Sequence, residues 1–79
     1  MATNDIIRDY ITSTLTSDGR EVSDTDLLVE DGIIDSFAIM SLLGFLEEQF
    51  SIQIGGDELM PENFQSIAAM TAMVERKTG

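Results

Sequence analysis

The segment Asp35-Ser36-Phe37 contains the residue types best suited to chemistry in this chain, and it opens the strongest helical pattern of the sequence. At a helix start, the hydroxyl of Ser36 lies beside unpaired backbone N–H groups and the positive end of the helix dipole, where a phosphate ester is stabilised. The adjacent carboxylate of Asp35 can help to hold a divalent cation during phosphate transfer. An Asp-Ser pair is also an ordinary helix cap, so the tripeptide alone leaves both interpretations open.

Composition excludes several other kinds of chemistry. The 79 residues include no Cys and no His, which excludes disulfides, zinc–thiolate sites, thiol nucleophiles and a Ser-His-Asp triad within the chain. The 15 Asp and Glu residues outnumber 4 Lys and Arg, and the net charge of −11 argues against nucleic acid and anionic membranes as partners. The same charge favours basic protein surfaces as partners.

A stretch around Gly32 superficially resembles part of an EF-hand calcium loop. Aligned on that glycine, it lacks three ligand oxygens, because the corresponding residues are Leu27, Val29 and Ala38. The EF-hand interpretation therefore fails, and no firm metal site is predicted. The acidic loop residues are expected to be solvated charges, with weak Ca²⁺ or Mg²⁺ binding as a second possibility: Asp24, Asp26, Glu30 and Asp31.

Two stretches in the first two thirds of the chain have the apolar spacing of amphipathic helices. Residues 4–15 should form a helix that begins with Thr3 or Asn4 as its N-cap. Residues 35–50 should form a second helix, with Asp35 as N-cap and a core face of Ile39, Leu42, Leu43, Leu46 and Phe50. The opposite face contains Phe37, Met40, Ser41, Gly44 and Glu48, so two apolar residues are expected to point away from the core.

The segments around these helices have weaker patterns. Residues 16–34 are expected to form a long loop that the apolar residues Val22, Leu27 and Leu28 pin to the core. A connector over 51–56 should be anchored by Ile52 and Ile54, and an irregular turn with Pro61 at a first helical position should follow. Ser66 should cap a last helix whose shared face contains Ile67, Met70, Thr71 and Val74.

These elements predict a single all-α domain over residues 1–79. Three main helices and one short helix are expected to pack as a small four-helix bundle, with a long loop between the first and second helices. No apolar run is long enough to span a membrane, and the N-terminus lacks the pattern of a signal peptide. The expected location is therefore the cytoplasm.

The run from Leu28 to Phe37, LVEDGIIDSF, followed by Leu42-Leu43 and Phe50, resembles the phosphopantetheine attachment region of acyl and peptidyl carrier proteins. The resemblance covers nearly the whole chain, including its length, its acidity and the order of its helices. The family motif is of the type Asp-Ser-Leu, and Phe37 replaces the leucine here. The apolar pair after Gly32, followed by Asp-Ser-Phe, is most similar to stand-alone D-alanyl and other aminoacyl carrier proteins.

This resemblance implies that a separate phosphopantetheinyl transferase attaches 4'-phosphopantetheine from coenzyme A to Ser36, with Asp35 assisting at a Mg²⁺ ion. The attached arm supplies a thiol that the chain itself lacks, and the cargo is an acyl or aminoacyl thioester. The protein would then be a monomeric carrier and not an enzyme. An adenylation or other loading enzyme would supply the cargo, and a downstream acyltransferase or synthase would accept it.

The resemblance also implies that partners dock on the start and exposed side of the second helix. The candidate docking residues are Phe37, Met40, Glu47, Glu48, Ile54 and Asp57. Some of these have alternative roles, because Met40 and Ile54 are also suited to the core, and Glu47 and Glu48 to a solvated helix face.

Several alternatives stay open from the sequence. Ser41 and Gly44 replace the larger or acidic residues usual in carriers for fatty acid synthesis, which favours a specialised pathway over that housekeeping one. Gly44 is expected to mark the close approach of a neighbouring backbone, and the alanines of the last helix, Ala68, Ala69 and Ala72, line a gap or pack tightly. A rival from another class is an unmodified acidic interaction domain. The identity of the cargo, and whether the bundle encloses it, are not encoded in any pattern of the chain.

Overall fold

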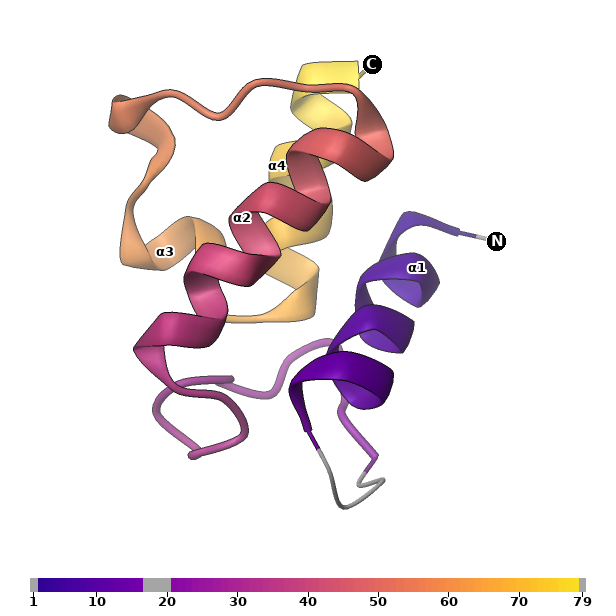
Figure 1. Cartoon of the computed structure of the whole chain (residues 1–79), viewed down its shortest axis with the longest axis vertical. Coiled ribbons are helices and arrows are strands. Elements are labelled where there is room, and N and C mark those ends of the chain that lie inside the picture. Colours follow the sequence, from indigo (N-terminus) through magenta and orange to yellow (C-terminus); the bar gives the residue numbers. More distant parts are fainter. Residues whose placement is uncertain (1, 17–20, 79) are drawn as a thin grey trace.

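The computed structural model describes residues 2–16 and 21–78, and Figure 1 shows their arrangement. The elements in chain order are α1 (Thr3–Tyr10), a π-helical turn η1 (Ile11–Leu15), α2 (Ser36–Phe50), a 3-10 turn η2 (Gly56–Glu58), α3 (Pro61–Phe64) and α4 (Ile67–Thr78). No strand occurs within the described residues. The predicted all-α bundle, with three main helices and one short helix, is confirmed.

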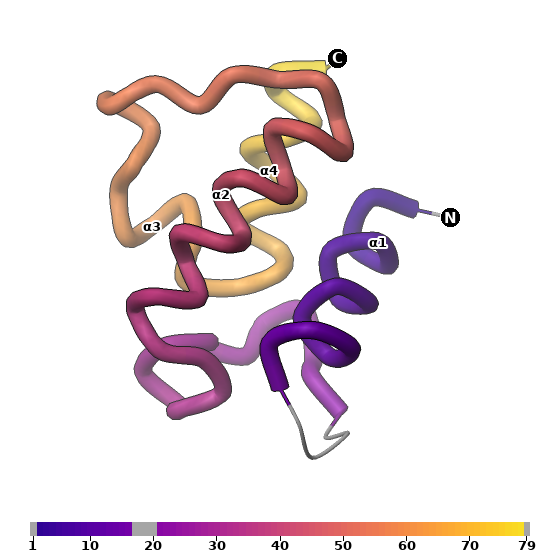
Figure 2. Tube along the Cα trace, in the orientation of Figure 1, coloured from indigo at the N-terminus to yellow at the C-terminus, as the bar shows by residue number. Residues whose placement is uncertain are grey.

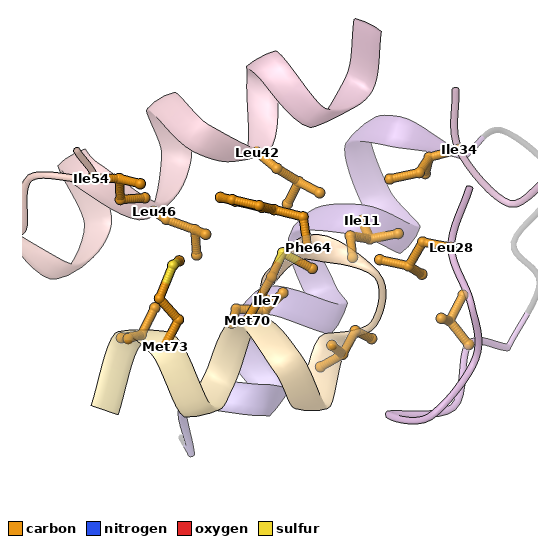
Figure 3. Packing of buried hydrophobic residues seen from close by; sticks show 13 residues of the cluster. Ile7, Ile11, Leu28, Ile34, Leu42, Leu46, Ile54, Phe64, Met70 and Met73 are labelled. Atoms are coloured by element: carbon orange, nitrogen blue, oxygen red, sulfur yellow. The ribbon is translucent and has the colours of Figure 1, made fainter. Parts of the chain in front are cut away.

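The three main helices surround one apolar core. Figure 1 shows α2 crossing in front of α4, with α1 beside them, and Figure 2 shows residues 21–34 running behind the lower end of α1 to the start of α2. In Figure 3, Leu42 and Leu46 of α2 point toward Met70 and Met73 of α4. The buried apolar residues are Ile7, Ile11, Val22, Leu28, Ile34, Leu42, Leu46, Ile54, Phe64, Ile67, Met70, Met73 and Val74.

The core face predicted for α2 agrees with the structure. Leu42 and Leu46 are fully buried, and the other three predicted residues of this face are partly buried and pack against the core. The predicted opposite face is exposed at all five positions. This agreement follows from the 3.6-residue period, which separates the apolar and polar sides of an uninterrupted helix of 15 residues.

The predicted start of the first helix is wrong. Ala2 occupies the N-cap position, no side chain caps the helix, and the Asn4 amide instead donates to the Asp24 carboxylate over 2.9 Å. The helix continues as the π-helical turn, in which the Thr12 hydroxyl donates to the Arg8 carbonyl over 3.0 Å. The predicted end of this helix at residue 15 agrees with the last residue of the turn, Leu15.

The long loop is fixed to the rest of the fold by polar contacts as well as by its apolar anchors. Arg8 forms an ion pair with Asp24, and its Nε donates to the Val22 carbonyl over 3.1 Å. The backbone N–H of Ala68 donates to the Asp24 carbonyl over 2.8 Å. Asp24 therefore connects α1, the loop and the start of α4. The expectation that Asp24 is a solvated charge is therefore wrong.

The contacts of the Asp24 carboxylate with Asn4 and Arg8 make the free energy of unfolding depend on pH. The Asn4 amide and the Arg8 guanidinium hold the pKa of the Asp24 carboxyl below its ordinary value. As the pH falls, the unfolded chain therefore takes up this proton first. The stabilisation is complete above the ordinary carboxyl pKa of about 4, and it is lost as the pH falls through the lower pKa of the folded state.

We expect the unfolding free energy of the Asp24→Asn variant to fall less than that of the wild type between about pH 5 and pH 2. Urea titrations at stepped pH values measure this difference. Relief of the net negative charge acts in the opposite direction in both proteins, so the comparison isolates Asp24. Parallel pH curves for the two proteins would contradict the assignment.

Polar contacts hold the segment between α2 and α4 against α4. The Glu58 carboxylate pairs with Lys77 of α4 at 2.6 Å and accepts the backbone N–H of Gly55 over 3.1 Å. Pro61 is the first residue of α3, as predicted, and the Ser66 hydroxyl accepts the Ala69 N–H over 3.1 Å, which confirms the predicted cap of α4. Glu58 thus connects the turn before α3 to the last turn of α4.

Gly44 does not mark a close backbone approach, so that expectation is wrong. A Cβ atom placed there would meet nothing within 4 Å, and the position is exposed in the middle of α2. A glycine in a helix interior costs about 0.5–1 kcal/mol relative to alanine. We expect Gly44→Ala to raise the free energy of unfolding by about that amount, measured by urea denaturation. An unchanged or lower free energy of unfolding would contradict the expectation that a methyl group at this position is accommodated without strain.

Candidate functional site

The start of α2 presents Ser36 with its hydroxyl available. Asp35 is the N-cap, and its Oδ1 accepts the backbone N–H of Ala38 over 2.9 Å, as the sequence predicts. Ser36 is the first residue of the helix, so its side chain is not needed as the cap. Both residues are exposed, and no other described residue forms a hydrogen bond with the Ser36 hydroxyl. This arrangement leaves a primary hydroxyl at the positive end of the helix dipole.

The two roles of Asp35 can be separated by substitution. We expect Asp35→Ala to lower the free energy of unfolding by about 1 kcal/mol because it removes the cap, whereas Asp35→Asn keeps a capping oxygen and most of the stability. Urea denaturation of the two variants measures the difference. Equal losses of stability in both variants would contradict capping through the side-chain oxygen. The alanine and asparagine variants also separate the cap from any role of the carboxylate charge.

A groove opens directly beside Ser36, between the start of α2, the long loop and α3. Its volume is about 400 Å³, and its lining is mostly apolar. The lining residues are Leu27, Val29, Glu30, Ser36, Ile39, Leu59, Met60, Pro61, Phe64 and Gln65. The size lies within the range of small-molecule sites in proteins. The alanines of α4, Ala68, Ala69 and Ala72, do not line this groove. The predicted gap beside these alanines is therefore not the groove next to Ser36.

The apolar residues predicted to face away from the core are exposed. Phe37 is 81% exposed and Met40 is 69% exposed, so the alternative core position of Met40 is excluded. The other exposed large apolar residues are Val29, Leu59 and Met60, and all three line the groove. The exposed apolar surface of the described residues is therefore concentrated around Ser36. Val29, Leu59 and Met60 were not predicted to be part of this surface. The signal that could have found two of them is the apolar pair Leu59-Met60 directly before Pro61, in a segment that cannot be a helix interior.

Two of the predicted docking residues have internal roles instead. Ile54 is only 9% exposed and belongs to the core, so its assignment to the docking surface is wrong. The Glu47 carboxylate accepts the backbone N–H of Ile54 over 3.0 Å, which fixes the connector to α2. Glu47 is therefore half-buried and bonded within the fold, and it is not a freely solvated charge. Glu48 and Asp57 are exposed, as docking residues must be.

Charges are distributed unevenly around the site. The described cationic side chains pair or hydrogen-bond away from it: Arg8 with Asp5 and Asp24, Lys77 with Glu58, and Arg76 with Asn63. The residues lining the groove include a glutamate and no lysine or arginine. No group of three or more acidic side chains that could hold a metal ion occurs among residues 2–16 and 21–78. In that same part of the chain, no helix has the length and hydropathy of a membrane span.

No protein-family model matches the chain. A probable acyl carrier protein, PigG of Serratia sp. (strain ATCC 39006), is 41% identical over 49 residues, which make up 62% of this chain. This match supports the acyl carrier protein family. The matched region spans 56% of the length of PigG.

A similar fold is found among solved structures. A chain in "Crystal structure of FAD-dependent dehydrogenase" superposes with a TM-score of 0.66 and 25% sequence identity. The match covers 91% of this chain and 97% of the solved chain, so the two chains are of similar length. The likeness therefore extends over almost the whole fold.

Proposed function

We propose that the protein is a non-catalytic carrier that bears 4'-phosphopantetheine on Ser36 and presents an acyl or aminoacyl thioester to partner enzymes. The observation that carries the proposal is an exposed serine hydroxyl, not used as a cap, at the start of α2 and at the edge of an apolar groove. The match to a probable acyl carrier protein supports the same function.

The residues around Ser36 fit the prosthetic group. A phosphodiester on the Ser36 oxygen would lie at the positive end of the α2 dipole, which stabilises its negative charge. Asp35 keeps one carboxylate oxygen for the cap, and its second oxygen is available to help hold Mg²⁺ while the transferase works. The arm supplies the thiol that forms the thioester, because the chain has no cysteine.

The exposed surface fits protein partners. Phe37 and Met40 offer apolar contacts beside Ser36, while Glu48 and Asp57 offer charges to basic residues of a partner enzyme. We propose three kinds of partner: a phosphopantetheinyl transferase, an adenylation or other loading enzyme, and a downstream acyltransferase or synthase. A specialised aminoacyl or secondary-metabolite pathway fits better than housekeeping fatty acid synthesis, because Ser41 and Gly44 leave the middle of α2 small and uncharged.

A flavin-dependent dehydrogenase is a further partner class that we propose. The solved chain of similar length and fold belongs to a structure described as an FAD-dependent dehydrogenase. A dinucleotide-binding domain of the Rossmann type needs a parallel sheet with helices on both faces, and the described residues of this chain contain no strand. The carrier would therefore supply the bound substrate to such an enzyme and would not hold the flavin itself.

The test is incubation of the purified protein with coenzyme A, Mg²⁺ and a phosphopantetheinyl transferase of broad specificity. Intact mass spectrometry should show the gain of one phosphopantetheine, and fragmentation should locate the added mass at Ser36. A protein that stays unmodified with several competent transferases would be an acidic interaction domain in which Asp35-Ser36 is only a helix cap.

A further inference from the structure

We infer that Glu30, which lines the groove beside Ser36, selects a cargo with a cationic amino group when the loaded arm lies in that groove. This inference rests on the carrier function proposed above and deepens it. It assigns a specificity-determining residue to the carrier itself, in addition to any selection by the loading enzyme.

The position of the groove makes the arm its natural occupant. Ser36 is one of its lining residues, so an arm attached there begins at the groove. The volume of about 400 Å³ is that of a small-molecule site, and the lining by Ile39, Leu59 and Phe64 provides apolar surface for an aliphatic chain. An intramolecular ligand has a high effective concentration, so even weak contacts populate the docked state.

Glu30 is the charged member of this lining. Three acids near Glu30 each accept a backbone N–H: Asp26 from Ser23, Asp31 from Leu27, and Asp35 from Ala38. None of the described residues donates a hydrogen bond to Glu30. Its carboxylate is therefore available to a ligand, whereas its neighbours are committed to the backbone.

The backbone fixes Glu30 in place. The turn around it is closed by the Gly32 N–H to the Val29 carbonyl over 3.0 Å, and by the Ile33 N–H to the Leu28 carbonyl over 2.9 Å. Gly32 has a φ of 74°, a conformation that favours glycine, and Leu28 is fully buried. The turn is thus anchored to the core on one side and presents Val29 and Glu30 to the groove on the other.

Charge complementarity decides the class of cargo. An α-amino group is mainly protonated near neutral pH and can pair with Glu30 beside an apolar wall. A dicarboxylic acyl group would instead bring a second carboxylate next to Glu30, in a groove without lysine or arginine. The geometry therefore favours aminoacyl groups with aliphatic side chains, disfavours acidic acyl groups, and gives simple acyl groups no charge partner.

The experiment uses the intact carrier loaded with stable arms, in which an amide replaces the thioester. Three arms carry valyl, isovaleryl and succinyl groups, so that the first two differ only in the amino group. Methyl NMR shifts of Ile39, Leu59 and Met60 report how much of each arm is docked. We expect the valyl arm to be docked about two- to fivefold more than the isovaleryl arm, which is the range for an exposed ion pair, and the succinyl arm least.

Glu30→Gln should abolish the difference between the valyl and isovaleryl arms. Glu48→Gln is the matched control, because Glu48 is an exposed acid of α2 that does not line the groove, and it should keep the difference. Equal docking of the two arms in the wild type, or a difference that persists in Glu30→Gln, would overturn the inference. Intact mass confirms that each arm is attached; a failure of attachment would instead overturn the carrier function and the inference with it.

Discussion

Ser36→Ala should abolish attachment of phosphopantetheine completely while leaving the fold intact. In the proposed function, the hydroxyl oxygen of Ser36 is the group that forms the phosphodiester. The cap of α2 comes from Asp35, and Ser36 is exposed, so the substitution removes no cap and creates no cavity. Alanine is also the best helix former. We therefore expect intact mass to stay unchanged after incubation with a transferase, and Tm to stay within a few degrees of the wild type.

Ser41→Ala is the matched control for this prediction. Ser41 is also an exposed serine of α2, but it lies more than one turn after the helix start. This variant should be modified to the same extent as the wild type. Continued modification of Ser36→Ala, or loss of modification in Ser41→Ala, would show that the attachment site has been assigned to the wrong residue.

Leu42→Ala should have the largest effect on stability among the substitutions considered. The Leu42 side chain is fully buried and points toward Met70 across the centre of the core (Figure 3). Removing such a side chain costs about 2–5 kcal/mol, which is a large share of the stability of a small domain. We expect a loss of cooperative unfolding or a strongly lowered Tm, because each kcal/mol shifts Tm by about 4–8 °C in a domain of this size. Calorimetry measures both quantities.

Phe37→Glu is the contrasting variant on the same helix. Phe37 is 81% exposed, so the substitution should change the free energy of unfolding by no more than about 0.5 kcal/mol. It should nevertheless slow modification and loading, because it replaces an apolar contact beside Ser36 with a charge. A large loss of stability in Phe37→Glu would contradict its exposed position, and unchanged partner kinetics would remove it from the docking surface.

The extent to which sequence predicts this fold depends on how local each feature is. The face of α2 and the caps by Asp35 and Ser66 were predicted correctly because their partners lie within four residues along the chain. The buried position of Met73 was missed, since the sequence analysis assigned only Ile67, Met70, Thr71 and Val74 to the face of the last helix.

Contacts between distant residues could not be predicted in the same way. The bonds from Asn4 and Arg8 to Asp24, and from Glu47 to Ile54, depend on how the helices pack, and no periodicity in the chain encodes them. These contacts explain why Asp24 and Glu47, which were expected to be solvated charges, form hydrogen bonds within the fold. The groove beside Ser36 was missed for the same reason, since its walls come from three separate segments.

The stacked ring pair between α1 and α2 provides a spectroscopic probe. Tyr10 is the single tyrosine of a chain without tryptophan, and its ring lies 4.0 Å from that of Phe45 with an interplanar angle of 14°. The tyrosine band of the near-ultraviolet circular dichroism and tyrosine emission therefore report on one defined place, the contact between these two helices. A change in these signals without loss of helical content would reveal separation of α1 from α2 before the bundle unfolds.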